Sequence, residues 1–345
     1  MDTAVQSEIS AARQLAAALS DSAVASLPET GWIRVTGSDR VRWLNGMVTN
    51  SIQALTAGRG CYNLALNAQG RIQGDLNAFA PIDDPDALLL ETDRSQIDAL
   101  MSHLDHFIIM DDVELSDITD QLSGLLVVGP NADSFVQGLK LNLPEDPLTL
   151  AFTERNGSAV RIIRAYGPLV PRLEIWSDRN TIGSIEAALS STIQLSAESL
   201  EYLRLLEGTP RYGTDIRNTD KAHDLPQETA MYGTESRALH FAKGCYLGQE
   251  IVERIRSRGN VHRTFIGFEL AGELPGAGTT LQAGGKAVGE LTSVGRIPLA
   301  GRSIQLALGY VRREALERKL PLEYPGGTAS PVPLPYRAAL PAGRV

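Results

Sequence analysis

The most unusual segment of the chain is Lys243-Gly244-Cys245-Tyr246-Leu247-Gly248-Gln249-Glu250, which continues as Ile251-Val252-Glu253-Arg254. Two glycines bracket the cysteine, and glycine allows a backbone to turn tightly and to approach a ligand closely. The residues from Gly248 to Arg256 have a helical pattern, with Gly259 as the expected C-terminal stop. We therefore expect Cys245 to lie just ahead of a helix N-terminus, with Lys243 close by.

Two interpretations of Cys245 follow from this setting. A neighbouring lysine and a helix start both favour the reactive thiolate form of a cysteine. Free cysteine is also among the most buried residue types, so a structural cysteine in a loop-to-helix turn is the alternative. Cys61, which precedes an expected strand at 62–66, is expected to be structural. Glu250 and Arg254 are spaced i,i+4, which taken alone is typical of an ion pair on a helix surface.

Two further carboxylates stand out because of the segments that carry them. Asn67–Asp75 resembles a hairpin turn followed by an inward-pointing acid, and a buried aspartate is costly unless it has a partner. Asp75 is therefore either partnered or functional, unless the turn lies in water. Glu228 lies on a loop shaped by Pro226, where it could accept two hydrogen bonds from the ring N–H and amino group of a pterin. The alternative is an ordinary solvated loop glutamate.

Hairpins and helices are mixed along the first 206 residues, which predicts an α+β fold rather than a doubly wound parallel sheet. We expect helices at 4–19, 38–47 with Ser38 as the N-cap, near 93–104, 131–141, 181–189 and 196–206, the last stopped by Gly208 and Pro210. Strands are expected at 32–36, 87–92, 122–128, 160–166 and 173–176, and 64–80 is strand-like but broken at Gly70 and Gly74, as in a hairpin. After Arg263, short strands at 265–270, 286–293 and 303–311 alternate with glycine-rich turns, as in a small barrel or sandwich. The tail from Pro321 is rich in proline and is expected to be mostly extended.

Composition narrows the class of protein. A length of 345 residues favours two or three domains. The net charge of −9 argues against a protein that binds nucleic-acid phosphates directly. Two cysteines cannot form a four-thiolate site, so no metal site is expected, and they favour a reducing compartment. No secretory signal pattern or stretch approaching 18 apolar residues is present, so we expect a cytoplasmic protein without a membrane span.

The motif at 243–250 resembles the signature of the YgfZ-type folate-binding proteins, a branch of the glycine-cleavage T-protein superfamily. Further similarities occur in the family's order along most of the chain, at Gly37–Arg40, Trp43–Gly46, Gly208–Asp215, Pro226–Glu228, Gly289–Ser293 and Ala307–Val311. The resemblance implies α+β domains around a central folate channel, capped by a C-terminal β-barrel. It implies a folate-binding region at 1–245 with an inner subdomain near 55–140, a motif helix and linker at 246–262, and a barrel with its tail at 263–345.

The resemblance also implies a cofactor and partners. The cofactor is tetrahydrofolate, and the role is the assembly or repair of iron–sulfur enzymes, with those proteins or their assembly machinery as partners. We assign ligand contacts to the residues that match the family's pattern or could meet the folate tail: Asp75, Glu228, Lys243, Tyr246, Glu250 and Arg254, with Arg211 behind them. Cys245 and Asp75 are the candidates for chemistry.

A comparison with the related aminomethyltransferases leaves a second function open. Asp75 falls where those enzymes carry their catalytic aspartate, which favours folate-dependent one-carbon transfer. Gly74, however, replaces the first acid of their paired aspartates, and Cys245 with Gly244 is typical of the YgfZ-type branch. A third hypothesis, a Cys–His hydrolase using Cys245 with His223, His240 or His262, ranks low because no thiol-hydrolase signature surrounds the cysteine.

Overall fold

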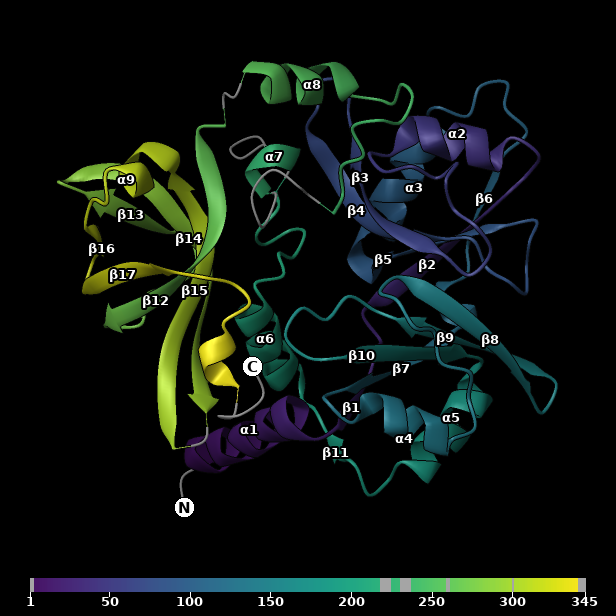
Figure 1. The fold of residues 1–345 in the computed structure, drawn as a ribbon, viewed down its shortest axis with the longest axis horizontal. Coiled ribbons are helices and arrows are strands. Elements are labelled where there is room, and N and C mark those ends of the chain that lie inside the picture. The colour runs from purple at the N-terminus through teal and green to yellow at the C-terminus, as the bar shows by residue number, and fades with distance from the viewer. Residues whose placement is uncertain (1–2, 218–224, 230–236, 259–260, 300, 341–345) are drawn as a thin grey trace.

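The computed structural model describes residues 3–217, 225–229, 237–258, 261–299 and 301–340, except for the side chains of 3–9 and 228–229. Figure 1 shows a barrel on one side of the molecule and two sheets with their helices on the other. Helix α8 lies along the top of this view, and helices α1 and α6 lie between the barrel and the lower sheet. The mixed α+β character expected from the sequence is confirmed.

The upper sheet has five antiparallel strands in the order β3-β4-β5-β2-β6. These are β2 (Thr30–Thr36), β3 (Gly60–Leu66), β4 (Ile72–Phe79), β5 (Leu88–Asp93) and β6 (Glu114–Asp117). Leu44 of α2 (Arg40–Met47) and Leu100 of α3 (Ile97–Asp105) pack against it in one buried cluster. The short helix η1 (Arg94–Gln96) precedes α3, and the Asp93 side chain accepts the Ser95 N–H, as expected of a cap.

The lower sheet has six strands in the order β11-β1-β7-β10-β9-β8. They are β1 (Ala23–Ser26), β7 (Ser123–Val128), β8 (Thr149–Arg155), β9 (Ser158–Arg164), β10 (Arg172–Ser177) and β11 (Ile193–Gln194), with helices η2 (Thr119–Gln121), α4 (Ala132–Gly138) and α5 (Arg179–Ala188). The upper sheet is inserted in the chain between β1 and β7 of the lower one. Buried Trp32, Phe79 and Trp176 pack between the two sheets. The domain boundaries drawn from the sequence stay a prediction.

The barrel is closed by six strands in the order β12-β15-β14-β13-β16-β17. They are β12 (Arg263–Gly272), β13 (Thr279–Ala283), β14 (Lys286–Leu299), β15 (Arg302–Arg312), β16 (Leu322–Tyr324) and β17 (Gly327–Val332), with helices α9 (Arg313–Glu317) and η3 (Arg337–Ala339). Our interpretation of the segment from Pro321 as an extended tail was incomplete, because β16 and β17 belong to it and β17 pairs with β12 to complete the ring. Pro331 lies in β17 opposite Phe268, beyond the residues of β17 that pair with β16.

Two local expectations were wrong. Ser38 does not cap α2, because its hydroxyl donates to Asp112 at 2.8 Å and the N-cap position is Asp39. Gly74 does not interrupt the hairpin; it lies inside β4 opposite Ala65, and the turn is made at Gly70, whose φ is +69°. A positive φ is readily available only to glycine. Of the two glycines at which a break was expected, only Gly70 therefore lies in the turn, and Gly74 lies in the strand.

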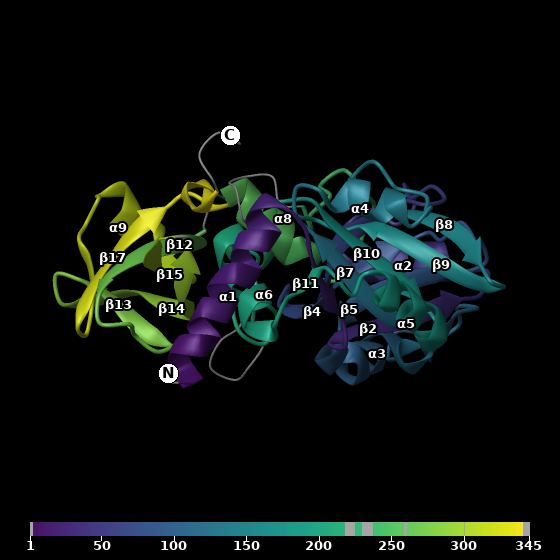
Figure 2. The ribbon, with the colours of Figure 1, turned by 90° about the horizontal axis from the view of Figure 1, so that it is seen from below.

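Helices α1 (Thr3–Ser20) and α6 (Ala197–Glu207) join the barrel to the lower sheet, as the view from below shows (Figure 2). Leu15 of α1, Leu203 of α6 and Leu306 of β15 share one buried cluster. Helix α6 ends at Gly208, as predicted, in the left-handed conformation with φ +73°, and the Ser196 hydroxyl caps its start. The barrel and the sheets are therefore packed through a shared apolar core.

Candidate functional site

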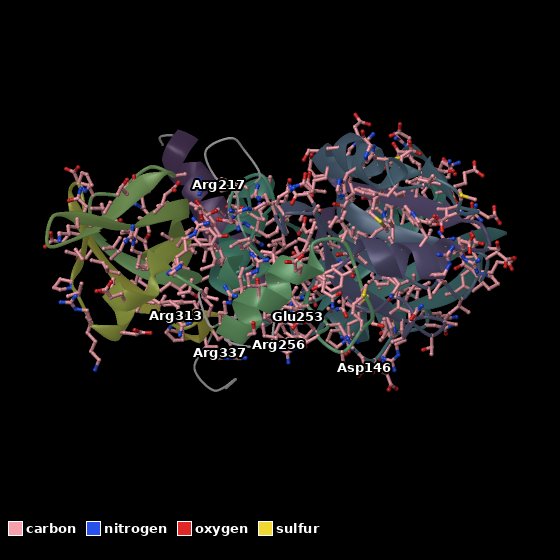
Figure 3. The ribbon with its side chains drawn as sticks, turned by 90° about the horizontal axis from the view of Figure 1, so that it is seen from above. Asp146, Arg217, Glu253, Arg256, Arg313 and Arg337 are labelled. Atoms are coloured by element: carbon pink, nitrogen blue, oxygen red, sulfur yellow. The ribbon has the colours of Figure 1, made fainter. Side chains whose placement is uncertain are left out.

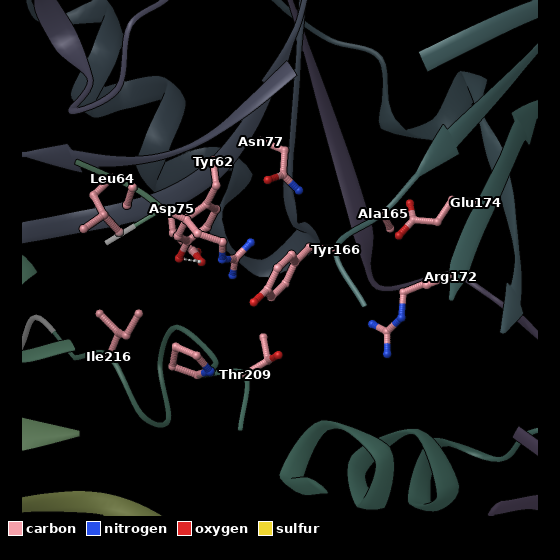
Figure 4. Close-up of a pocket in the computed structure, with 13 residues that line it drawn as sticks. Tyr62, Leu64, Asp75, Asn77, Ala165, Tyr166, Arg172, Glu174, Thr209 and Ile216 are labelled. Atoms are coloured by element: carbon pink, nitrogen blue, oxygen red, sulfur yellow. Dashed lines mark hydrogen bonds between the residues drawn. The ribbon is translucent and has the colours of Figure 1, made fainter. Parts of the chain in front are cut away.

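A cavity of about 240 Å3 lies where the two sheets and the loop after α6 meet. It is lined by side chains from β3, β4, β10 and the segments around 165, 210 and 238: Tyr62, Leu64, Asp75, Asn77, Ala165, Tyr166, Arg172, Glu174, Thr209, Pro210, Ile216, Arg237 and Ala238. Figure 4 shows Asp75 and Tyr62 together, with Glu174 and Arg172 on the other side of Tyr166. Carboxylates, guanidinium groups and phenol rings thus line one small space.

Asp75 projects from β4 into this cavity and is held by two donors. The Tyr62 hydroxyl donates to its carboxylate at 2.8 Å, and the Gln96 side-chain amide donates to the other oxygen at 2.8 Å. Burial is the largest influence on this group and raises the pKa of Asp75, against the opposing effect of the two hydrogen bonds. The sequence left two readings of Asp75, and the structure shows that it is partnered and also lines the cavity.

Aromatic rings and an arginine form the centre of the cavity. The Arg237 guanidinium carbon lies 3.3 Å from the centroid of the Tyr166 ring and 5.3 Å from that of Tyr62. Guanidinium groups stack on aromatic faces in this way, and such a flat arrangement also suits a planar heterocycle. Burial and the charge of Asp75 raise the pKa of Tyr62 well above its usual range, so its hydroxyl keeps the proton that it donates.

Arg172 brings positive charge to the opposite side of the cavity. Arg172 is the first residue of β10, and its guanidinium group donates to the Glu207 carboxylate at 2.8 Å. Glu207 lies at the end of α6 and is only 1% exposed. The Arg172 Nε is buried and has no hydrogen-bond partner among the described residues. Burial raises the pKa of Glu207, while the charge of Arg172 acts in the opposite direction. The pair therefore fixes one guanidinium group at the cavity wall.

Lys243 of the signature segment is hydrogen-bonded to backbone carbonyl groups of α2 and of the residues that follow it. Its ammonium donates to the carbonyl oxygens of Asn45, Val48 and Asn50 at 2.7, 2.6 and 2.5 Å. Burial lowers the pKa of Lys243 to about 8. The lysine does not line the cavity, and in this position it holds the loop that carries Cys245.

Tyr246 supports the cavity from behind. Its ring is buried in the cluster that includes the cavity-lining Leu64, Ile216 and Ala238. Burial raises the pKa of Tyr246 to about 12. Gly248 follows with φ +81°, and a Cβ there would lie 2.6 Å from the carbonyl oxygen of Asn67, so the signature glycine allows α8 (Gln249–Arg258) to start against the β3–β4 turn.

The two cysteines differ in exposure. Cys245 is exposed, whereas Cys61 on β3 is partly buried and burial raises the pKa of its thiol. His240 and His262 are both exposed, and His223 lies outside the described residues. The position of Cys245 fits the expectation that solvent reaches it, but it does not line the cavity.

The remaining predicted contacts lie apart from the cavity. Glu250 and Arg254 form an exposed ion pair at 2.6 Å along α8, and Arg211 pairs with Glu201. Figure 3 looks onto α8, with its residues Glu253 and Arg256 between the barrel and the sheets. Glu228 lies in the short helix α7 (Pro226–Thr229), but its side chain is outside the described part of the chain.

Of the predicted site residues with described side chains, the structure thus brings only Asp75 into the cavity. Sequence reasoning missed Tyr62, Tyr166, Arg172, Glu174 and Arg237. One signal was available: Arg172 and Glu174 are charged residues two apart at an expected strand, where they share a face with each other. Arg237 lies in a long loop-like stretch, and no pattern there indicated it. The assigned roles of all these residues stay predictions.

Residues 1–165 match the family model described as the GCVT N-terminal domain. Among curated proteins, the chain is 27% identical over 250 residues to the tRNA-modifying protein YgfZ of Colwellia psychrerythraea, covering 72% of each chain. Over residues 1–165 the chain thus matches the glycine-cleavage T-protein domain, and over most of its length it is similar to the YgfZ-type proteins. A putative chloroplastic transferase of Arabidopsis thaliana is 25% identical over 300 residues, which are 85% of this chain and 66% of that protein, slightly under two thirds of its length.

The superfamily fold is confirmed by a solved structure. The glycine cleavage system aminomethyltransferase T of Bartonella henselae superposes with a TM-score of 0.80 over 96% of this chain and 90% of that one, at 18% identity. Together with the closed six-stranded barrel, this establishes the T-protein-like architecture that the resemblance implied. At this identity the likeness concerns the fold alone.

Proposed function

We propose that the protein binds tetrahydrofolate in the cavity around Asp75. The observation that carries this proposal is the lining itself: the acceptors Asp75 and Glu174 lie on either side of the rings of Tyr62 and Tyr166. A pterin is flat and carries N–H donors along one edge, so it needs aromatic faces and carboxylate acceptors. When bound, tetrahydrofolate would supply the nitrogen atoms that carry one-carbon units.

The size and charge of the cavity support this ligand. Its volume of about 240 Å3 is smaller than the ~300–1,000 Å3 of sites that enclose whole drug-sized ligands. We infer that it encloses the pterin and leaves the aminobenzoyl-glutamate tail to extend outward. Arg172 and Arg237 are the cations at the cavity, and they replace Lys243, Arg254 and Arg211 as first candidates for meeting an anionic part of the ligand.

We further propose that the folate-bound protein supports the assembly or repair of iron–sulfur cluster enzymes through Cys245. The signature segment of the YgfZ-type branch supports this role, and so does the exposed position of the thiol on a loop held by Lys243. The partners are then cluster enzymes or their assembly machinery. We propose that this role is in the cytoplasm, because two cysteines in 345 residues favour a reducing compartment. We propose no direct nucleic-acid partner, because the net charge is −9. Within the described residues, no helix is long and apolar enough to cross a membrane.

A titration tests the binding step. Tetrahydrofolate should bind the wild-type protein, and Asp75→Leu should weaken it about 10- to 100-fold, as for the loss of a hydrogen bond to a charged group. Asp98→Leu is the control, because Asp98 is an exposed aspartate on α3. Calorimetry showing no binding to the wild-type protein would end the folate proposal.

Assays in cells test the accessory role. Cys245→Ala should leave folate binding and protein abundance unchanged in a deletion strain, yet fail to restore the activity of several iron–sulfur enzymes. Cys61→Ala at matched abundance is the comparison. Full restoration by Cys245→Ala would remove the thiol from the proposal.

The alternative function is a folate-dependent aminomethyl or other one-carbon transferase. The position of Asp75 in the cavity favours it, since this residue falls where aminomethyltransferases carry an aspartate. A glycine-cleavage assay separates the two proposals. Turnover that Asp75→Asn abolishes would support the transferase, and its absence with intact folate binding would support the accessory factor.

A further inference from the structure

Two carboxyl groups, one from each sheet, meet at the wall of the cavity. Glu91 on β5 is 8% exposed and lies opposite Asn77 of β4, on the face that carries the cavity lining. Glu174 on β10 lines the cavity itself, and its carboxyl group lies close enough to that of Glu91 for the two groups to interact. The upper and lower sheets are therefore connected at this point through two acids.

The hydrogen-bond partners of the pair require a proton. Asn77 donates to Oε2 of Glu91 at 2.9 Å, and the Trp176 indole donates to Oε2 of Glu174 at 3.0 Å. Ionised carboxylates only accept, so a hydrogen bond between these two groups needs a proton on one of them. Two like charges in contact in a buried site also cannot both ionise at ordinary cost.

The cations near the pair are engaged elsewhere. Arg172, on the same strand as Glu174, pairs with Glu207, and Arg161 of the adjacent strand β9 pairs with Asp83. Arg237 lies over Tyr166, and the nearby Asp75 is held by Tyr62 and Gln96. Within the described residues, no ion pair with a lysine or arginine includes Glu91 or Glu174. Among the described residues, a proton is therefore the neutralising charge that remains for this pair.

Burial decides which acid carries the proton. Glu91 is enclosed, whereas Glu174 faces the cavity, so the cost of ionisation is greater for Glu91. Burial first, and then the neighbouring Glu174, raise the pKa of Glu91 well above its usual range. All partners are then satisfied: Glu91 accepts from Asn77 and donates to Glu174, which also accepts from Trp176.

We propose that Glu91 is an uncharged carboxylic acid, whose O–H donates to Glu174 and fixes Glu174 as the acceptor for an N–H group of the ligand. Glu91 is thus a positioning residue. It lets Glu91 and Glu174 meet at the cavity without two like charges in contact. The ligand part of this proposal rests on the proposed folate binding, and the protonation part does not.

Infrared spectroscopy of the ligand-free protein tests the protonation. The wild-type protein should show the C=O band of an un-ionised carboxyl at neutral pH, and Glu91→Gln should remove it. Glu198→Gln, which changes an exposed glutamate on α6, should leave the band unchanged. If Glu91→Gln removes no such band, Glu91 is ionised and the proposal is wrong.

Tetrahydrofolate titrations test the positioning. Glu91→Leu, which can neither accept from Asn77 nor donate to Glu174, should weaken binding about tenfold. Glu91→Gln should recover most of that loss, because its amide accepts from Asn77 and donates to Glu174 as the neutral acid does. Glu174→Gln should weaken binding about 10- to 100-fold. Equal losses in the Leu and Gln variants of Glu91 would overturn the positioning role.

If Glu91→Leu does not fold, the positioning role can still be tested by measuring tetrahydrofolate affinity against pH for the wild-type protein and Glu91→Gln. Wild-type affinity should fall at alkaline pH as Glu91 loses its O–H beside Glu174, whereas Glu91→Gln should show no such fall. Matching profiles would contradict the proposal. A protein that shows the infrared band but binds no tetrahydrofolate would refute the folate function and the ligand contact, while leaving the protonated acid established.

Discussion

Gln96 holds Asp75 at two points: its side-chain oxygen accepts the Asp75 backbone N–H at 3.2 Å, and its side-chain nitrogen donates to the Asp75 carboxylate at 2.8 Å. Gln96 is 5% exposed and belongs to η1, the turn that leads from β5 into α3. The orientation of the cavity's aspartate is therefore set by a residue that does not line the cavity.

Replacing Gln96 should disturb Asp75 without removing any lining group. Gln96→Leu deletes both hydrogen bonds and should lower the free energy of unfolding by about 1–3 kcal/mol, because a buried donor and a buried acceptor are left unpaired. Tetrahydrofolate affinity should fall with it. Urea denaturation measures the first effect and calorimetry the second. Gln69→Leu, in the exposed β3–β4 turn, should change neither.

The Arg172–Glu207 pair predicts strong non-additivity. Arg172→Met should destabilise the protein by about 3–5 kcal/mol, because it removes the guanidinium group that donates to the Glu207 carboxylate, which is only 1% exposed. The double variant Arg172→Met with Glu207→Leu should recover much of that loss, since neither charge remains buried. Urea unfolding of all four proteins completes the cycle. Additive effects would show that the pair makes little net contribution.

Cys245 should be the faster of the two thiols to react. It is exposed, whereas Cys61 is partly buried with the pKa of its thiol raised by burial. Limited alkylation of the native protein followed by peptide mass spectrometry should therefore label Cys245 first. Cys245→Ala should leave the midpoint of urea unfolding within about 0.5 kcal/mol, as for an exposed site. Preferential labelling of Cys61 would contradict this assignment.

His103 should make stability decrease in mild acid. Burial lowers its pKa from 6.5, while its Nε2 lies 3.1 Å from the carbonyl oxygen of Leu66. The unfolded chain therefore binds more protons than the folded one between the two pKa values. The free energy of unfolding should fall as pH drops below about 6.5. His103→Gln should flatten this part of the profile, and His262→Gln, at an exposed site, should not.

Local patterns predicted much of the fold because they are set by nearby residues. Ser196 and Gly208 mark the ends of α6, and the alternation after Arg263 indicates the barrel strands. The closing strands β16 and β17 were not predicted, because their short proline-rich sequence becomes strand only by pairing with β12 and β13. Tertiary pairing of this kind overrides local propensity.

The candidate site was less predictable than the fold. Asp75 could be singled out because an acid beside a hairpin turn is costly to bury. Arg237 and Tyr166 could not, since they meet only after two loops that are 71 residues apart in sequence come together. The signature segment drew attention to Lys243 and Tyr246, and in the structure these two support the loop and the cavity wall from behind.

The closure of the barrel by β17 has a consequence for synthesis of the protein. Both sheets are complete in sequence at Gln194, whereas β12 gains its β17 neighbour only after about 60 further residues have been added beyond Gly272. Since N-terminal units fold first on the ribosome, the sheets form while the barrel is still an open ribbon with an exposed edge. A ribosome stalled before residue 327 would therefore hold a formed cavity beside an aggregation-prone edge strand.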